Sequence, residues 1–169
     1  MLTVTDRDLL TIDPSTFIGA AAGAGTVLLS ADDASVTGTE LESAGSDFAA
    51  RGVEAGLVAV INDAIVVEIV SRTGATTLEV SLPRANADDD QIPPGDVGDA
   101  AMKIITFARV IDLQRSQLLR SLGVDETAVV DAAPLAQLIA LRAIAHILSH
   151  AAAAAPEDAS LQARSVTAA

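Results

Sequence analysis

Residues 57–72 read LVAVINDAIVVEIVSR, and this stretch decides how the middle of the chain folds. Two runs rich in Val and Ile, each of strand length, lie on either side of Asn62-Asp63. β-Branched residues favour strands, and a short polar pair between two apolar runs is typical of a tight turn. The stretch therefore predicts two antiparallel strands joined by a hairpin at Asn62-Asp63.

Similar runs continue on both sides of this hairpin. Upstream lie TVLLS and SVTGTELES, and downstream lies TTLEVSL. Turn signals at Thr37-Gly38 and Thr73-Gly74 separate neighbouring runs. Four or five short strands at this spacing predict a small antiparallel β-barrel or sandwich over residues 26–84.

The N-terminal segment predicts a short helix followed by a flexible connector. Thr5 can cap a helix over residues 5–11, and Asp8 stands at the spacing of a capping box. Asp13-Pro14 is expected to end this helix, because the residue before a proline disfavours helical backbone angles. The Ala- and Gly-rich residues 19–25 are expected to form a connector.

An acidic segment rich in Pro and Gly follows the strands at residues 85–100. Its Asp88-Asp89-Asp90 run resembles part of a calcium loop. An EF-hand, however, needs alternating oxygen ligands and a later bidentate Glu, and the segment has none in register. A solvated linker is the favoured interpretation.

The rest of the chain shows helical periodicity. A first helix is expected between Thr106, a plausible N-cap, and Gly123, which stands where a left-handed glycine ends a helix. A second helix begins near Pro134 and is apolar on more than one face, so it must be buried on several sides. A third, short helix follows Pro156 and ends in SVTAA, which is expected to fray. The expected apolar contacts of this third helix are Leu161 and Val166.

Together these segments predict an α+β fold. Helices are expected in residues 1–25 and 101–169, and a small antiparallel β-barrel or sandwich is expected at residues 26–84. The acidic linker at residues 85–100 leads back to the helices.

The composition excludes several kinds of function. The chain has 169 residues, no Cys, no Trp, no Tyr and a formal net charge of −13, and Lys103 is its one lysine. These counts remove disulfides and thiolate chemistry, and they leave few aromatic platforms for stacking bases. Residues 31–100 hold 14 acids and three bases, a net charge of −11, which argues against a grip on phosphate backbones. The remaining residues carry a net charge of only −2, so two parts with different surfaces are expected.

No cofactor or metal motif is complete. His146 and His150 have the spacing of a helical metal pair, but no Glu lies between them and no third ligand is evident. Gly19, Gly23 and Gly25 precede a strand-like run, whereas the glycines of a phosphate loop follow a strand and open a helix. We therefore expect no metal and no cofactor.

Catalytic groups are equally incomplete. Ser149 adjoins His150, but helical neighbours point about 100° apart, so they make no dyad. Glu40 and Glu42 fall on one face of a strand, which is common in acidic proteins. Three arginines on one predicted helix could bind phosphate, but in an acidic chain they are expected to pair with carboxylates, either within the fold or in a subunit contact: Arg109, Arg115 and Arg120. We expect no catalytic residue, and a structural or assembly protein rather than an enzyme.

One segment, residues 133–155, is apolar and long enough to be weighed as a membrane span. It contains Arg142, and a charge near the centre of a lone span costs roughly 2.5–3.5 kcal/mol. Asp6 and Asp8 stand where a secretory signal carries basic residues. We therefore expect a soluble protein that is neither secreted nor bound to a membrane.

The apolar second helix is instead the predicted assembly surface. A Leu138→Asp substitution is expected to abolish folding or assembly, because it puts a charge on an apolar helix. The candidate interface residues are Leu135, Leu138, Ile139, Arg142, Ile144, Ile147 and Leu148.

Four segments together resemble the head-to-tail connector proteins of tailed bacteriophages, also called adaptor or neck proteins, which gene-transfer particles share. They are TVTDRDLLTIDPSTF (3–17), DFAARGVEAGLVAVI (47–61), EIVSRTGATTLEVSLPRA (68–85) and ITFARVIDLQRSQLLRSLGV (105–124). The resemblance covers roughly residues 3–150 as an order of elements. In such proteins the N-terminal helix and the C-terminal helices form a helical bundle, and some carry a β-rich insertion. The resemblance therefore implies a bundle built from residues 1–25 and 101–169, with the β-domain at residues 26–84 inserted into it.

The resemblance implies a virion protein of the neck, assembled in the cytoplasm of the bacterial host. It would form a ring of subunits, twelvefold in the family, under the portal protein. A stopper or tail-completion protein would bind below, and DNA would pass through the channel without specific binding. Alternatives are another neck or tail-completion protein, such as a stopper, a non-viral oligomeric binding module, or a small enzyme of unknown type.

Overall fold

The hairpin at Asn62-Asp63 is present and forms part of a closed β-barrel. In the computed structural model, which describes residues 2–155 and 158–168, β3 (Val58–Ile61) pairs antiparallel with β4 (Ile65–Arg72). Asn62 and Asp63 both have φ of +52°, a left-handed conformation that Asn and Asp tolerate better than other residues with a Cβ. The hairpin prediction is confirmed.

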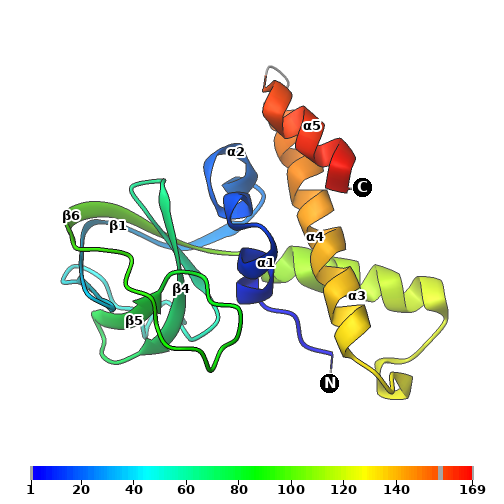
Figure 1. Cartoon of the computed structure of the whole chain (residues 1–169), viewed down its shortest axis with the longest axis horizontal. Coiled ribbons are helices and arrows are strands. Elements are labelled where there is room, and N and C mark those ends of the chain that lie inside the picture. The colour runs from blue at the N-terminus through cyan, green and yellow to red at the C-terminus, as the bar shows by residue number, and fades with distance from the viewer. Residues whose placement is uncertain (1, 156–157, 169) are drawn as a thin grey trace.

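The barrel has six strands and is closed. The other strands are β1 (Thr26–Thr37), β2 (Glu40–Ser43), β5 (Thr77–Ser81) and β6 (Val97–Thr106). They follow the order β1-β2-β5-β4-β3-β6, every pair is antiparallel, and β6 returns to pair with β1 (Figure 1). Because the barrel is closed, its sheet has no free edge strand. Apolar side chains fill the interior. The fully buried interior residues include Leu41, Phe48, Val53, Ile61, Ile69, Leu78 and Met102.

The sixth strand begins inside the segment expected to be an acidic linker. Ala100, Met102 and Ile104 point into the barrel, while the residues between them face outward. This alternation is a strand pattern, but the Gly, Asp and Ala residues at the start of β6 have low strand propensity and hide it. β6 forms because β1 and β3 supply backbone partners along both of its edges.

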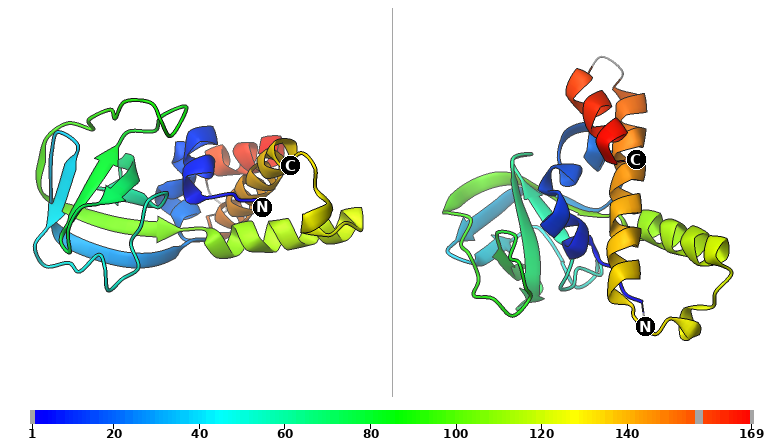
Figure 2. Two further views of the ribbon diagram at one scale, coloured as in Figure 1. Left: turned by 90° about the horizontal axis from the view of Figure 1, so that it is seen from below. Right: turned by 45° about the vertical axis from the view of Figure 1, so that its right-hand side comes forward.

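The helices lie at the other end of the molecule. They are α1 (Asp6–Ile12), α2 (Gly19–Ala22), α3 (Ala108–Leu122), α4 (Ala133–Ala154) and α5 (Ala159–Ala168), with two 3-10 turns, η1 (Pro14–Phe17) and η2 (Glu126–Ala128). α3 continues directly from β6 and crosses α4, and α5 folds back along the C-terminal half of α4 (Figure 2). α1 and α2 lie between the barrel and α4.

The prediction of a helical bundle is therefore wrong. A bundle needs nearly parallel helices that share one apolar seam. Here the steep crossing of α3 and α4, fixed by the exit direction of β6, prevents such a seam. The structure is instead an α+β fold in which a closed antiparallel barrel packs one outer side against a layer of helices that meet on α4.

Two separate cores result from this arrangement. One fills the barrel; the other lies between the helices and the outer wall of β3 and β6, to which Val58, Val60 and Ile105 contribute. Phe17 of η1 and Phe107, the residue that joins β6 to α3, meet edge to face in this second core with ring centroids 5.1 Å apart. Two of the three Phe in the chain thus mark the junction of barrel and helices.

Most predicted helix ends are present. The backbone nitrogen of Thr5 donates to the Asp8 carboxylate at 2.7 Å at the start of α1, and Gly123 ends α3 with φ of +65°. The N-cap expected at Thr106 is wrong by one residue, because Thr106 still pairs in β6 and Phe107 occupies the cap.

The third predicted helix is α5, but only one of its two expected contacts forms. Leu161 is buried against the helical core, whereas Val166 is 78% exposed, so the prediction for Val166 is wrong. Residues up to 168 of the SVTAA tail belong to α5, and Ala169 lies outside the described residues.

α4 is long and apolar enough to cross a membrane by length and composition. One side of it is nevertheless built into the helical core. The buried residues of α4 are Ile139, Ala140, Ala143, Ile144, Ile147, Leu148, Ala151 and Ala152. The apolar composition of α4 therefore matches its place in the helical core.

The Ala/Gly segment at residues 19–25 is not a flexible connector throughout, because Gly19–Ala22 form the short helix α2. Its last residue, Gly25, has a packing role. A Cβ added there would lie 2.6 Å from Cγ2 of Ile105 and 3.0 Å from the ring of Phe107, so the chain enters β1 where only glycine fits. We predict that Gly25→Ala lowers the free energy of unfolding by about 1–3 kcal/mol through overpacking. Gly98→Ala is the matched control, since nothing lies within 4 Å of its added Cβ, and should stay within about 0.5 kcal/mol of wild type. Equal effects of both substitutions in urea unfolding would contradict the close approach.

Candidate assembly surface

The residues proposed as an interface on α4 divide between its two faces. Ile139, Ile144, Ile147 and Leu148 are at most 4% exposed and belong to the helical core. Leu135 is partly buried against the same core. Leu138, at 42% exposed, and Arg142 remain at the surface. Leu141, which lies between them in sequence, is also 45% exposed.

These exposed residues line a groove between α3 and α4. The groove has a volume of about 620 Å³, and its walls include Leu138, Leu141, Arg142 and His146. Nε of Arg142 donates to Oε1 of Gln114 on α3 at 3.3 Å, and Gln114 is only 5% exposed. This hydrogen bond joins Arg142 of α4 to α3, and Arg142 remains exposed to solvent.

A second hollow lies on another side of α4, where α1 and α5 approach it. It has a volume of about 400 Å³ and is mostly apolar, with Leu141, Ile144 and Leu148 on the α4 side. Arg164 of α5 binds the carboxylate of Asp13 at 2.6 Å and thereby closes one end. Leu141 separates the two hollows, because it lines both.

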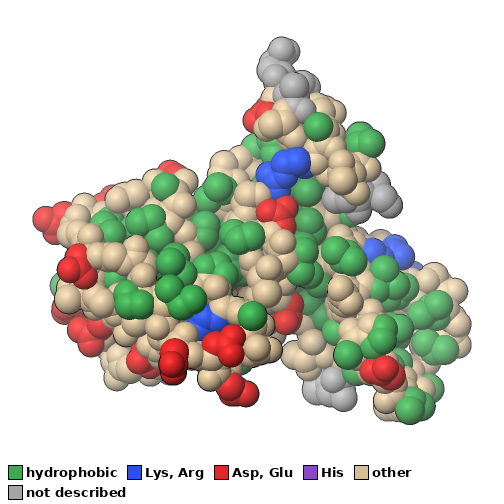
Figure 3. Space-filling model, in the orientation of Figure 1, with side chains coloured by type: hydrophobic (Ala, Val, Ile, Leu, Met, Phe, Trp, Pro, Cys, Tyr) green, Lys and Arg blue, Asp and Glu red, His purple; other side chains and the backbone are tan. Residues whose placement is uncertain are grey.

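Acidic side chains concentrate on the barrel, whereas the surface over the helices is largely apolar (Figure 3). Residues 26–106 hold 14 acids and four bases, a net charge of −10. By contrast, α3 and α4 together hold four arginines and a single acid, Asp112. Hydrogen bonds from the Ser43 hydroxyl and the Gly45 N–H lower the pKa of Asp33, so this carboxylate keeps its charge in mild acid.

The arginines of α3 are only partly paired. Arg115 binds Asp112 at 2.8 Å, one turn away on α3. Arg109 and Arg120 are exposed and belong to no ion pair formed within residues 2–155 and 158–168. The predicted pairing with a carboxylate is therefore confirmed for Arg115. For Arg109 and Arg120, whose partners were expected in the fold or in a subunit contact, it stays a prediction.

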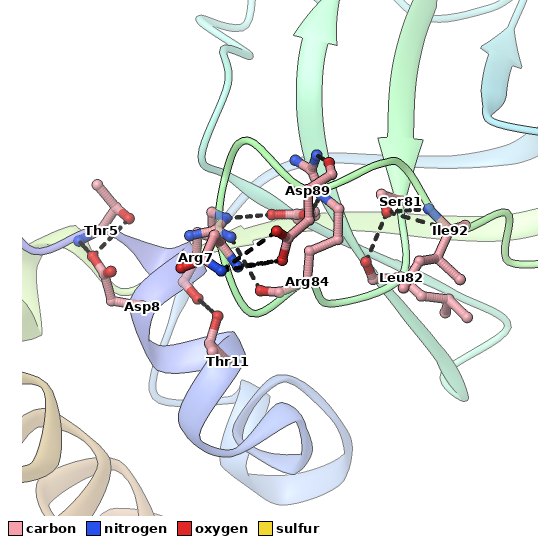
Figure 4. Close-up of polar contacts among 11 residues, drawn as sticks. Thr5, Arg7, Asp8, Thr11, Ser81, Leu82, Arg84, Asp89 and Ile92 are labelled. Atoms are coloured by element: carbon pink, nitrogen blue, oxygen red, sulfur yellow. Dashed lines mark hydrogen bonds and ion pairs between the residues drawn. The ribbon is translucent and has the colours of Figure 1, made fainter.

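A buried ion cluster, missed by the sequence reasoning, joins the helices to the barrel. Glu68 of β4 is 1% exposed and binds both Arg7 of α1, at 2.5 Å, and Arg84. Arg7 also donates from Nη2 to the backbone oxygen of Arg84 at 3.0 Å, and Arg84 donates from Nη1 to the backbone oxygen of Asp89 at 2.5 Å (Figure 4). The signal was a lone Glu inside the apolar run AIVVEIVSR, since a buried carboxylate requires cationic partners.

The other polar motifs do not assemble into a site. His146, Ser149 and His150 are exposed on α4. Glu40 stands directly opposite Glu79 on the barrel wall, and neither carboxylate belongs to an ion pair formed within residues 2–155 and 158–168. Within the described residues, no group of three or more His, Cys, Asp or Glu side chains is arranged to hold a metal ion.

Asp6 connects α1 to the start of α3. Its side chain is only 4% exposed, and its carboxylate accepts a hydrogen bond from the Phe107 N–H at 2.7 Å. Burial raises the pKa of Asp6, and hydrogen bonds from Thr106 and Phe107 partly oppose that shift. Asp6 therefore links α1 to the start of α3, and its ionised form carries a desolvation penalty because it is buried.

We predict that Asp6→Asn changes how stability depends on pH. Because the folded-state pKa of Asp6 lies above its unfolded value of 3.8, the folded protein binds more protons in the range between the two values. The wild-type free energy of unfolding, relative to that of Asp6→Asn, should therefore rise as the pH falls through the raised pKa and level off below 3.8. Urea unfolding at a series of pH values measures this difference. If the difference between the two free energies of unfolding becomes smaller as the pH falls, folding instead stabilises the ionised carboxylate of Asp6.

Comparison of this chain with protein-family models, with curated proteins and with solved structures gives no match.

Proposed function

We propose that this chain is a structural subunit of the neck of a tailed bacteriophage or gene-transfer particle. In this role it is a head-to-tail connector that forms a ring under the portal protein, and it receives a stopper or tail-completion protein on its other side. The four segments quoted above suggest this family, and the fold departs from the helical bundle that the resemblance implies.

The observation that carries the proposal is the unlike chemistry of the two ends of one chain. The helical end exposes Leu138 and Leu141 beside a groove and bears the arginines of α3 and α4. The barrel end is strongly acidic. A ring subunit meets a neighbour on each side through two different patches, so unlike and complementary ends suit such an assembly.

The acidic barrel also suits a channel through which DNA passes. Phosphate backbones are repelled by a surface of net charge −10, and the chain has few lysines or aromatics with which to retain them. The purified protein is therefore expected not to shift duplex DNA at physiological salt.

Mass measurement with portal assemblies tests the proposal. The protein is mixed with portal rings from the same genome, where its gene is expected shortly downstream of the portal and major capsid genes. Several copies should join each portal ring, and negative-stain images should show a collar on one face. A stable dimer that ignores portals supports the non-viral binding module instead, and binding to the tail side alone supports a stopper.

A further inference from the structure

We infer that neighbouring copies of this chain bind each other head to tail, with the acidic loop of one copy in the α3–α4 groove of the next. The acidic loop is defined as residues 85–92, between β5 and β6. This inference rests on the proposed function, because it names the contact between subunits of the proposed ring.

The acidic loop is held in one conformation although it has no regular secondary structure. Arg84 binds the backbone oxygen of Asp89, and the Asp89 carboxylate accepts from the Asn86 N–H at 2.8 Å. At the far end, the Ile92 N–H donates to Oγ of Ser81 at 2.8 Å, and the Leu82 N–H donates to the backbone oxygen of Ile92 at 2.8 Å (Figure 4). A loop ordered before binding loses little conformational entropy on docking.

The acidic loop exposes two carboxylate side chains and one apolar side chain to solvent. Asp88 and Asp90 are exposed, and neither belongs to an ion pair formed within the described residues. Ile92 is 46% exposed. The exposed set therefore combines negative charge with one aliphatic group.

The groove offers the complementary set. Arg142 is the arginine that lines it and donates to Gln114 on α3, and Leu138 and Leu141 are its exposed aliphatic residues. The two helices that form its walls, α3 and α4, together carry a net charge of +3 in a chain of −13. An Asp of the loop can pair with Arg142 while Ile92 packs against the leucines. Charge complementarity thus selects the acidic end of a second copy as the occupant.

A chain cannot place its own acidic loop in its own groove. The first residue of the loop, Ala85, approaches the α4 side that carries Ala133, Ala136 and Ala140. The groove lies on the side that carries Leu138, Arg142 and Ala145, which the helical repeat places on the opposite face of α4. The contact therefore joins different patches of two copies, which is the contact that builds rings and filaments rather than twofold dimers.

Cross-linking tests this contact with little background, because the chain has no cysteine. Ala87→Cys marks the acidic loop, and Ser149→Cys marks the exposed rim of the groove. A mixture of the two single variants, treated with a short bismaleimide, should give a covalent dimer. Neither variant alone should give this dimer, because each then carries a cysteine at only one of the two contacting sites. Ala49→Cys, exposed on the barrel outside the loop, replaces Ala87→Cys as the matched control and should give no dimer with Ser149→Cys.

Charge exchange gives a second readout. Arg142→Glu in the groove-labelled protein should lower the yield of the mixed dimer on the order of tenfold, and Asp88→Arg with Asp90→Arg in the loop-labelled protein should restore most of it. All these positions are exposed, so the variants should keep the wild-type fold by circular dichroism. A yield insensitive to the exchange, no mixed dimer, or a dimer of Ser149→Cys with itself overturns the inference.

The two proposals fail in different ways. Portal rings that bind the protein without the loop–groove cross-link leave the proposed function standing and remove this inference. A charge-dependent loop–groove cross-link in a protein that does not bind portal rings leaves this inference standing and removes the proposed function.

Discussion

Replacing Glu68 by Gln is expected to lower the free energy of unfolding by about 3–5 kcal/mol. The carboxylate is 1% exposed and binds Arg7 and Arg84, so its loss leaves two guanidinium groups facing a neutral amide in a buried place. At about 2–4 °C for each kcal/mol, the midpoint of thermal unfolding should fall by roughly 6–20 °C. Differential scanning calorimetry and urea unfolding measure the two quantities.

Glu42→Gln is the matched control for this prediction. Glu42 lies on β2, another strand of the same barrel, is exposed, and should change stability by less than about 0.5 kcal/mol. A triple variant in which Arg7, Glu68 and Arg84 become Met, Leu and Met should recover much of the loss, because apolar groups often replace a buried ion cluster without penalty. Similar small effects for Glu68→Gln and Glu42→Gln would show that Glu68 does not hold the helices on the barrel.

Ile147→Asp is expected to prevent folding, whereas Leu138→Asp is expected to leave the fold intact and abolish assembly. Ile147 is fully buried at the centre of the helical core, and an unpaired charge there costs several kcal/mol, a large part of the stability of any domain of this size. Leu138 is 42% exposed on the opposite side of the same helix, so its charged replacement stays in water. This outcome is narrower than the sequence-based expectation for Leu138→Asp, which included loss of folding.

The two variants carry the same substitution on one helix, so helix propensity is matched between them. Circular dichroism and calorimetry report folding, and co-sedimentation with portal rings reports assembly. A folded Ile147→Asp protein would contradict the placement of α4 in the core. An assembly-competent Leu138→Asp protein would remove the groove from the contact surface.

Most of the local structure was predictable, because it depends on neighbouring residues. β3, β4 and β5 follow from their β-branched runs, and the turn at Asn62-Asp63 follows from two residue types that tolerate a left-handed backbone. The run TVLLS and the start of SVTGTELES, predicted as separate strands, are joined in β1, and the end of SVTGTELES forms β2. The strand β6 was missed because its start has low strand propensity, and its partners β1 and β3 lie far away in sequence. For the same reason the Arg7–Glu68–Arg84 cluster was not predicted, although the lone Glu in an apolar run indicated that partners exist.

By itself, the sequence determined an α+β chain with an acidic middle, an antiparallel β-region, a long apolar helix near the C-terminus and no complete catalytic or metal motif. Only the tertiary structure decided that the β-region closes into a barrel, that the helices meet on α4 without forming a bundle, and which face of α4 is free. The reason is that α4 is apolar on more than one side, so its sequence is compatible with several orientations. The direction in which β6 leads into α3, together with the packing of α1 and α5, selects one of them and leaves Leu138, Leu141 and Arg142 at the surface.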